Sequence, residues 1–134
     1  MNIDIEVWKD ILCYEGEYQI SNYGNVRSLP RIIKRSNGRP LKIKGKILKQ
    51  NITKHGFNTV NLKGGKLKQT HPVHYLVAKT FIPNPKNYKY ILHKDTNYMN
   101  NYADNLEWVS YGDKKLFDYI ETNAKQWNIN SINP

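Results

Sequence analysis

The sequence predicts a single small α+β protein, with a sheet-rich first half and a compact, helical second half. Up to about residue 70, short stretches of alternating apolar and polar residues lie between turn-forming residues, which is typical of antiparallel strands. After them, apolar residues at positions 73, 76, 77 and 81 form one helical face. A chain of 134 residues, 39% hydrophobic and 12% aromatic, has enough apolar area for one folded core.

The first expected hairpin lies close to the N-terminus. Its strands are predicted at 18–20 and 26–28, where apolar and polar residues alternate, and a glycine-bearing turn at 22–25 joins them. Residues 30–45 are basic and rich in turn formers, with few apolar side chains. We interpret this segment as a loop or arm that becomes ordered on a partner.

The remaining elements follow from turn residues and periodicity. Gly56, Gly64 and Gly65 mark turns between strands, and Pro83 ends the first helix. The polar residues from Asn128 onward predict a frayed tail. In chain order, the predicted elements are strands at 46–50, 57–62 and 66–70, a helix at 73–81, a turn-rich segment at 93–105, a strand at 106–110 and a helix at 113–124.

The charge distribution indicates contact with nucleic acid. The formal charge is +10, and 13 lysines and arginines lie between Arg27 and Lys68 without one acidic residue. Such a surplus attracts polyanions and gives a salt-dependent affinity for phosphates. The alternative is a solvated lysine surface, as is common in proteins from AT-rich genomes. The predicted DNA contacts are Arg27, Arg31, Lys34, Arg35, Arg39, Lys42, Lys44, Lys46 and Lys49.

Other classes of protein are disfavoured. The longest apolar runs, such as 73–78, are far shorter than the roughly 20 residues of a membrane-spanning helix, so no membrane partner is expected. Cys13 is the only cysteine, which leaves no intrachain disulfide and no cysteine-based zinc cluster. A reducing, cytoplasmic setting fits this usage.

Two sets of short motifs resemble a known family. The segments 8–11, 14–16, 18–22 and 24–28 (WKDI, YEG, YQISN and GNVRS) are similar to the NUMOD4 module at the start of many phage and intron HNH homing endonucleases. The segments 73–78, 81–85 and 91–109 resemble the HNH module that follows it. The resemblance covers residues 6–115 and implies an origin in a phage or other mobile element, in the cytoplasm of its host.

The resemblance also implies an architecture. A small antiparallel, basic, DNA-contacting module would span residues 1–70, an HNH-like ββα-metal module with a C-terminal helix would span 71–127, and the tail would be 128–134. In this family a hairpin and a helix hold a divalent cation, Mg²⁺ or Mn²⁺, beside a histidine. His93 matches the general base and Asn105 the asparagine that supports and orders the loop. A neutral imidazole is a suitable base at physiological pH, and the cation neutralises charge on the phosphate.

Two positions depart from the family pattern. Leu92 stands where the family has an Asp or Asn metal ligand, and Lys114 where it has an Asn or His. An aliphatic side chain offers no ligand atom, and an ammonium repels a cation. Three explanations remain open at this stage. The site is inactive; or the metal is held by other oxygens, with Asp95 and Asp113 as weak candidates beside Asp104 and Asn101; or Lys114 contacts the phosphate while His93 acts as the base.

The sequence therefore predicts a DNA-binding protein of the HNH homing-endonuclease lineage, with two alternatives for its activity. One is a metal-dependent endonuclease or nickase, with His93 as the base, Asn105 as its support and Asp95 or Asp113 as a replacement ligand; Lys114 is the third candidate catalytic residue. The other is a non-catalytic descendant that binds double-stranded DNA, or binds and inhibits a host nucleic-acid enzyme. His74, on the apolar-faced helix, is interpreted as a packing residue.

Overall fold

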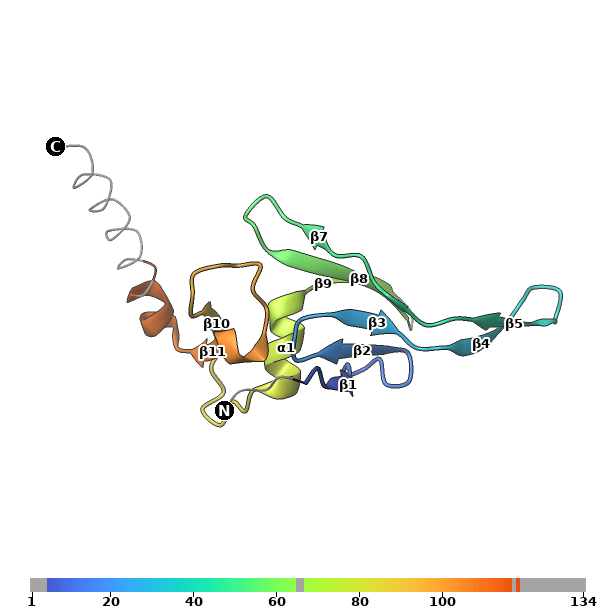
Figure 1. Cartoon of the computed structure of the whole chain (residues 1–134), viewed down its shortest axis with the longest axis horizontal. Coiled ribbons are helices and arrows are strands. Elements are labelled where there is room, and N and C mark those ends of the chain that lie inside the picture. The colour runs from blue at the N-terminus through green and yellow to red at the C-terminus, as the bar shows by residue number, and fades with distance from the viewer. Residues whose placement is uncertain (1–4, 65–66, 117, 119–134) are drawn as a thin grey trace.

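The structure is a computed structural model that describes residues 5–64, 67–116 and 118. It is a mixed fold of small antiparallel sheets around one helix (Figure 1). The first sheet has the order β1-β2-β3-β6. Its strands are β1 (Trp8–Asp10), β2 (Tyr18–Ser21), β3 (Val26–Ser28) and β6 (Lys46–Ile47).

The predicted hairpin at 18–28 is confirmed as β2 and β3, which pair antiparallel. Gly24 adopts φ +88° in its turn, a backbone conformation that a side chain disfavours. The hydroxyl oxygen of Ser21 accepts hydrogen bonds from the backbone N–H of Tyr23 at 3.2 Å and of Asn25 at 3.1 Å. A short polar side chain therefore fixes the turn from inside.

The segment 30–45 is a β-hairpin, which corrects its interpretation as a loop or arm without regular structure. Strand β4 (Arg31–Lys34) pairs with β5 (Pro40–Ile43), and the hairpin projects from the body of the molecule (Figure 1). Its turn contains Gly38 at φ +81°. Ile32 and Ile33 on β4, with Leu41 and Ile43 on β5, favour extended backbone on both sides of the turn despite the basic and turn-forming residues between them.

The next sheet has the order β7-β8-β9, formed by β7 (Asn51–Ile52), β8 (Asn58–Gly64) and β9 (Leu67–Pro72). The predicted strands at 57–62 and 66–70 correspond to β8 and β9. The predicted strand at 46–50 is wrong in extent, because only β6 is a strand there and it joins β3 in the first sheet. The turn at 54–56 is present, with Gly56 at φ +89°.

The helix α1 (Val73–Phe81) has the predicted bounds and lies between the sheets (Figure 1). It buries Val73, Leu76, Val77 and Ala78. One core cluster combines them with strand residues from both sides, including Ile20 and Val26 of the first sheet and Val60 and Leu62 of β8. At roughly 1.5–3 kcal/mol for each fully buried aliphatic side chain, this cluster is the main source of stability.

The last sheet joins β10 (Tyr90–His93) to β11 (Leu106–Val109), which follows a short 3₁₀ helix (Ala103–Asn105). Trp108 anchors this sheet to α1, because its indole N–H donates to the backbone oxygens of Ala78 at 3.3 Å and Ile82 at 3.1 Å. The predicted strand at 106–110 is present, whereas β10 was not predicted. Of the predicted second helix, residues 113–116 and 118 are helical, and the remainder lies outside the described residues, as does the tail at 128–134. Within the described ranges, no helix has the length and apolar character needed to cross a membrane.

Candidate functional site

His93 ends strand β10 and is 4% exposed. Its Nε2 lies 2.9 Å from Oδ1 of Asn101, also buried, in the loop between β10 and β11. An amide oxygen only accepts hydrogen bonds, so Nε2 carries the hydrogen and Nδ1 keeps a lone pair. The loop therefore holds His93 in the tautomer that a proton acceptor needs.

Aromatic side chains from distant segments surround this histidine. The ring of His74, on α1, lies with its centroid 5.1 Å from that of His93 in an edge-on arrangement. Phe57 lies 5.2 Å from the His74 ring and stacks on Tyr98 with centroids 4.6 Å apart. The turn before β8, the helix and the loop after β10 thus meet at one histidine pair.

Both histidines are held in the neutral form. Burial lowers the pKa of His93; the Lys114 charge lowers it further, while the Asn101 hydrogen bond and the Asp95 charge oppose this. Burial, the neighbouring His93 and the Lys114 charge lower the pKa of His74 to about 4. Nδ1 of His74 is buried and has no hydrogen-bond partner in the described part of the chain. A neutral imidazole is the form that accepts a proton.

Asn105 closes the loop that carries Asn101. Its Nδ2 donates to Oδ1 of Asp95 at 2.9 Å and to the backbone oxygen of Asn100 at 2.8 Å. Its Oδ1 accepts from the backbone N–H of Asp95 at 3.1 Å. The structure therefore places Asn105 as an organiser of the loop, while the direct partner of His93 is Asn101.

The carboxylate of Asp95, the first candidate ligand, is already engaged within the loop. Its Oδ1 accepts from the backbone N–H of Asn97 at 2.9 Å as well as from Asn105, and its Oδ2 accepts from Asn100 Nδ2 at 2.7 Å. These hydrogen bonds, with that from Asn100 the strongest cause, lower the pKa of Asp95. Asp113 lies on the exposed first turn of the helix that follows β11.

The residues around His93 do not fit a divalent cation. Leu92 pairs with Glu107 across the sheet and, by strand alternation, lies on the face opposite His93. Within the described ranges, no three His, Cys, Asp or Glu side chains gather as a metal-binding group. A hard cation such as Mg²⁺ requires several oxygen ligands, and the Asp95 carboxylate, which already accepts three hydrogen bonds within the loop, does not supply them alone.

Lys114 is a cationic residue whose charge acts on both histidines. Its backbone N–H donates to Ser110 O at 3.0 Å, which places it on the first turns of the helix after β11. Its side chain is 25% exposed, and its ammonium forms an ion pair with Asp118 at 2.9 Å. Its charge contributes to lowering the pKa of both His74 and His93.

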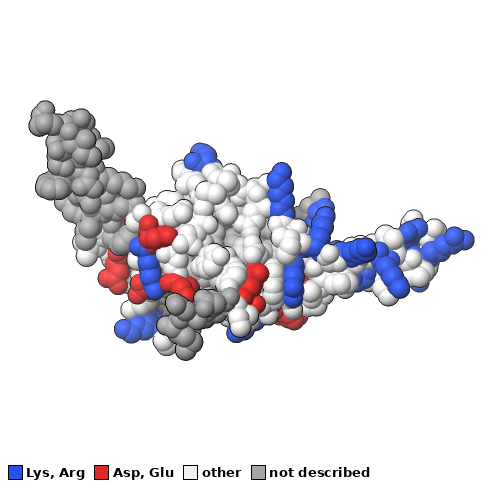
Figure 2. All heavy atoms as spheres, viewed as in Figure 1, with Lys and Arg blue, Asp and Glu red and all other residues white. Residues whose placement is uncertain are grey.

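The predicted DNA contacts are concentrated on and around the projecting hairpin, where Figure 2 shows lysine and arginine side chains along the whole extension. Lys34, Arg35, Arg39, Lys42 and Lys44 are exposed there, as are Lys46 and Lys49 beyond it.

Two of the predicted contacts are engaged in packing. The guanidinium of Arg27 lies 4.1 Å from the ring centroid of Trp8. Its Nε and Nη2 both donate hydrogen bonds to Gln19 Oε1, at 3.0 Å and 2.7 Å. Arg31 is half-buried, 6.0 Å from the ring centroid of Tyr18.

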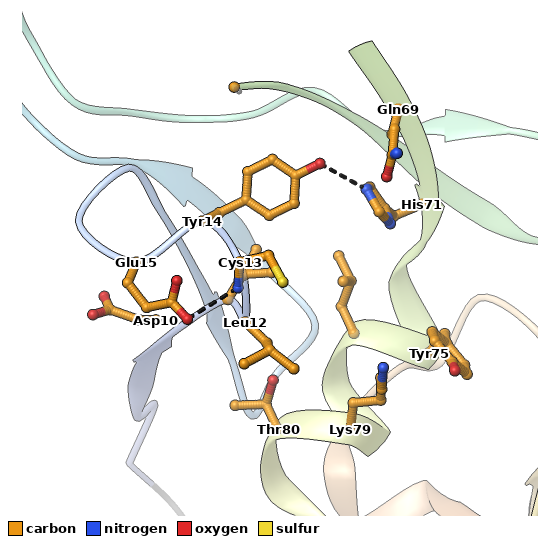
Figure 3. Close-up of a pocket in the computed structure, with 13 residues that line it drawn as sticks. Asp10, Leu12, Cys13, Tyr14, Glu15, Gln69, His71, Tyr75, Lys79 and Thr80 are labelled. Atoms are coloured by element: carbon orange, nitrogen blue, oxygen red, sulfur yellow. Dashed lines mark hydrogen bonds between the residues drawn. The ribbon is translucent and has the colours of Figure 1, made fainter. Parts of the chain in front are cut away.

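A hollow lies on another side of α1, away from His93. It has a volume of about 710 Å³ and is bounded by the β1–β2 connection, β9 and α1 (Figure 3). Tyr14 and His71 meet across it, with 3.2 Å between the phenol oxygen and Nε2. Tyr75 and Lys79 line its helical side. None of the residues around the histidine pair lines it.

Sequence reasoning missed three parts of the site. It assigned His74 to packing and gave Phe57 and Tyr98 no role, because no spacing in the sequence brings these three rings together. It named Asn101 as a possible oxygen ligand for a metal but not as the partner of His93. The only available signal for His74 was its position on an apolar helical face, where an unpaired imidazole costs free energy.

Comparison with known proteins identifies the lineage. The NUMOD4 motif matches residues 6–63. The chain is 42% identical over 104 residues to DNA endonuclease I-HmuI of Bacillus phage SP01, covering 77% of this chain and 52% of that protein. It is 38% identical over 104 residues to the uncharacterized HNH endonuclease L245 of Acanthamoeba polyphaga mimivirus, covering 78% and 27% respectively.

A solved structure gives the same result. The structure titled "DNA binding and cleavage by the HNH homing endonuclease I-HmuI" matches with a TM-score of 0.67 and 33% identity. The match covers 92% of this chain and 65% of that one. The chain spans about half the length of the phage relative and about a quarter of the mimivirus one. On the motif, the relatives and the fold together, this chain carries the NUMOD4 motif and is similar over most of its length to HNH homing endonucleases.

Proposed function

We propose that this protein binds double-stranded DNA along the β4–β5 hairpin and brings the His93 loop to the duplex. The observation that carries the proposal is the hairpin itself, a two-stranded ribbon that projects from the fold with exposed basic side chains and no acid between Arg27 and Lys68. A β-ribbon fits a DNA groove, and basic side chains beside it contact phosphates. The named relative and the solved neighbour, described as a DNA endonuclease, support this choice of partner.

The two faces of the hairpin differ in chemistry. The pairing of Ile32 with Lys42 and of Lys34 with Pro40 places both lysines on one face, which also presents the 66% exposed Ile32. The other face carries Arg31, Ile33, Leu41 and Ile43. The lysine face is the proposed phosphate-contacting surface, and it acts in the cytoplasm of a phage-infected or mobile-element host.

The test compares two double variants with the same loss of charge. Lys34→Gln with Lys42→Gln removes charge from the hairpin face, and Lys86→Gln with Lys89→Gln removes it from an exposed segment elsewhere. Binding to a duplex is measured by fluorescence anisotropy at several salt concentrations. The hairpin variant is expected to lower the slope of log K against log salt by about 0.9 for each lost contact, and the control to leave it unchanged. A natural protein whose binding does not depend on salt would refute the proposal and favour a host protein as partner.

The second candidate function is cleavage of one or both DNA strands with His93 as the general base. The observation that favours it is the hydrogen bond from His93 Nε2 to Asn101, which leaves the Nδ1 lone pair available to take a proton from water. A plasmid-nicking assay on the natural protein and on His93→Ala tests it. Nicking that disappears in His93→Ala supports the candidate, whereas equal products from both proteins, or none, would reject it.

A further inference from the structure

The chain that leaves the β4–β5 hairpin stays hydrogen-bonded to β3 as it runs back toward the β2–β3 turn. The backbone N–H of Lys46 donates to Ser28 Oγ at 3.1 Å, and the backbone N–H of Leu48 donates to Val26 O at 2.8 Å. The donors advance along the chain in steps of two residues while the acceptors go back by two, as in an antiparallel ladder. This strip connects the proposed DNA-contacting hairpin with the body of the fold.

Gln50 continues this series with its side chain. Its Nε2 donates to the backbone oxygen of Gly24 at 2.8 Å, and its Oε1 accepts from Asn58 Nδ2 at 2.9 Å. Gly24 belongs to the β2–β3 turn, and Asn58 begins β8 in the β7-β8-β9 sheet. Because an amide side chain both donates and accepts, this half-buried group joins the turn to a second sheet.

The same turn packs against the loop that holds His93. Gly24 comes so close to Asn101 that an added Cβ would lie 2.9 Å from Asn101 Cβ. The backbone oxygen of Asn22 accepts a hydrogen bond from the backbone N–H of Ala103 at 2.8 Å. Asn101 in turn accepts from the imidazole Nε2 at 2.9 Å. The side chain that fixes the turn is therefore linked to the imidazole by a direct contact at each step.

We propose that Gln50 is a positioning residue for His93. It holds the β2–β3 turn against the loop, and the turn in its place keeps Asn101 Oδ1 bonded to the imidazole Nε2. The strip that leaves the hairpin therefore sets the position of the loop as well. The connection with DNA rests on the proposed function, in which the hairpin contacts the duplex and brings the His93 loop to it.

The experiment measures how firmly the imidazole is held in the protein without DNA. His93 and Asn101 are both buried, so the Nε2–H proton exchanges with water only when the loop opens. Gln50→Met keeps the length of the side chain and loses both hydrogen bonds, so it is expected to speed this exchange about tenfold at constant pH, as measured by NMR. Gln69→Met makes the same change on an exposed residue of β9 and is the control, with no expected effect.

Two comparisons separate this role from a general loss of stability. The backbone N–H of Val60, buried in β8, reports opening of the whole fold and is expected to accelerate much less than the His93 proton in Gln50→Met. Gln50→Lys restores a donor for Gly24 O and is expected to slow exchange at His93 relative to Gln50→Met. Equal acceleration at Val60 and His93, or no slowing in Gln50→Lys, would overturn the positioning role. Melting curves establish that each variant is folded.

This inference and the proposed function fail in different ways. Equal exchange at His93 in the natural protein and in Gln50→Met would overturn the role of Gln50, whatever the protein does with DNA. Gln50→Met removes no charge, so the salt dependence of duplex binding is expected to stay that of the natural protein. A natural protein that binds no duplex would reject the proposed function, while the exchange rates would still decide the role of Gln50.

Discussion

The hydrogen bond from His93 Nε2 to Asn101 Oδ1, 2.9 Å long, selects the imidazole nitrogen that is free to act as a base. Both partners are buried, so water does not replace the bond without a rearrangement of the loop. This relationship leaves Nδ1 of His93 as the nitrogen with a free lone pair.

Replacement of Asn101 by Ala is expected to remove the preference of the His93 imidazole for the Nε2–H tautomer. The buried Nε2–H would lose its partner, which costs roughly 1–3 kcal/mol of unfolding free energy. Because the Asn101 hydrogen bond raises the pKa of His93, its loss should lower that pKa further. Nitrogen-15 NMR of the imidazole measures both the tautomer and the pKa. Asn97→Ala, an exposed loop change without a bond to His93, is the control, and equal spectra from the two variants would contradict the assignment.

Stability should fall as the pH is lowered because of His74. Its pKa is about 4 in the folded protein and about 6.5 when unfolded, so the unfolded chain binds the proton more tightly. This contribution is fully present above pH 6.5 and is lost progressively between pH 6.5 and about 4, to a limit of about 3 kcal/mol. Urea unfolding at a series of pH values measures it. His74→Gln should flatten the profile and His55→Gln, on an exposed turn, should not; a profile unchanged in His74→Gln would contradict the argument.

Removal of the Lys114 charge should raise the pKa of both histidines. The ammonium disfavours the protonated imidazoles, so Lys114→Gln relieves this repulsion. Proton NMR titration of the His74 and His93 ring resonances is the measurement. Lys115→Gln is the matched control. If both variants shift the pKa values of His74 and His93 equally, the effect does not come specifically from the ammonium of Lys114.

The β2–β3 turn should tolerate no side chain at Gly24. A Cβ there would lie 2.9 Å from Asn101 Cβ, in a backbone with φ +88°. Gly38 has a similar φ of +81° but open space around it. Gly24→Ala is therefore expected to cost at least about 2 kcal/mol more than Gly38→Ala, since only the first adds a collision to the backbone strain. Thermal unfolding of the two variants measures the difference in stability. Equal losses of stability would show that Asn101 moves aside without an energetic cost.

Local patterns predicted much of the fold. The sequence reveals elements that depend on nearby residues: the helical spacing of apolar residues in α1, the turn at Gly24 and the strand before Ser110. The pairing of β6 with β3 and the formation of β10 depend on distant partners. The β4–β5 hairpin was missed because its lysines and turn residues outweighed four aliphatic side chains in the interpretation.

The candidate site likewise contains residues that the sequence identifies and contacts that it does not. His93 and Asn105 belong to one contiguous motif, and the sequence identifies both. The contacts of Phe57, His74 and Tyr98 with that motif form only when three segments fold together. No spacing rule connects them. The proximity of Lys114 was suggested by its place in the motif, but its ion pair with Asp118 required the helix.

The contact between Gly24 and Asn101 has a consequence for inheritance. The backbone oxygen of Asn22 also accepts a hydrogen bond from the backbone N–H of Ala103 at 2.8 Å. The β2–β3 turn therefore packs directly against the loop that holds His93. A recombination event that exchanged only one of these segments would have to preserve the fit between them. We therefore expect the two sequence modules to pass between genomes together, and a grafted His93 loop to require its original turn.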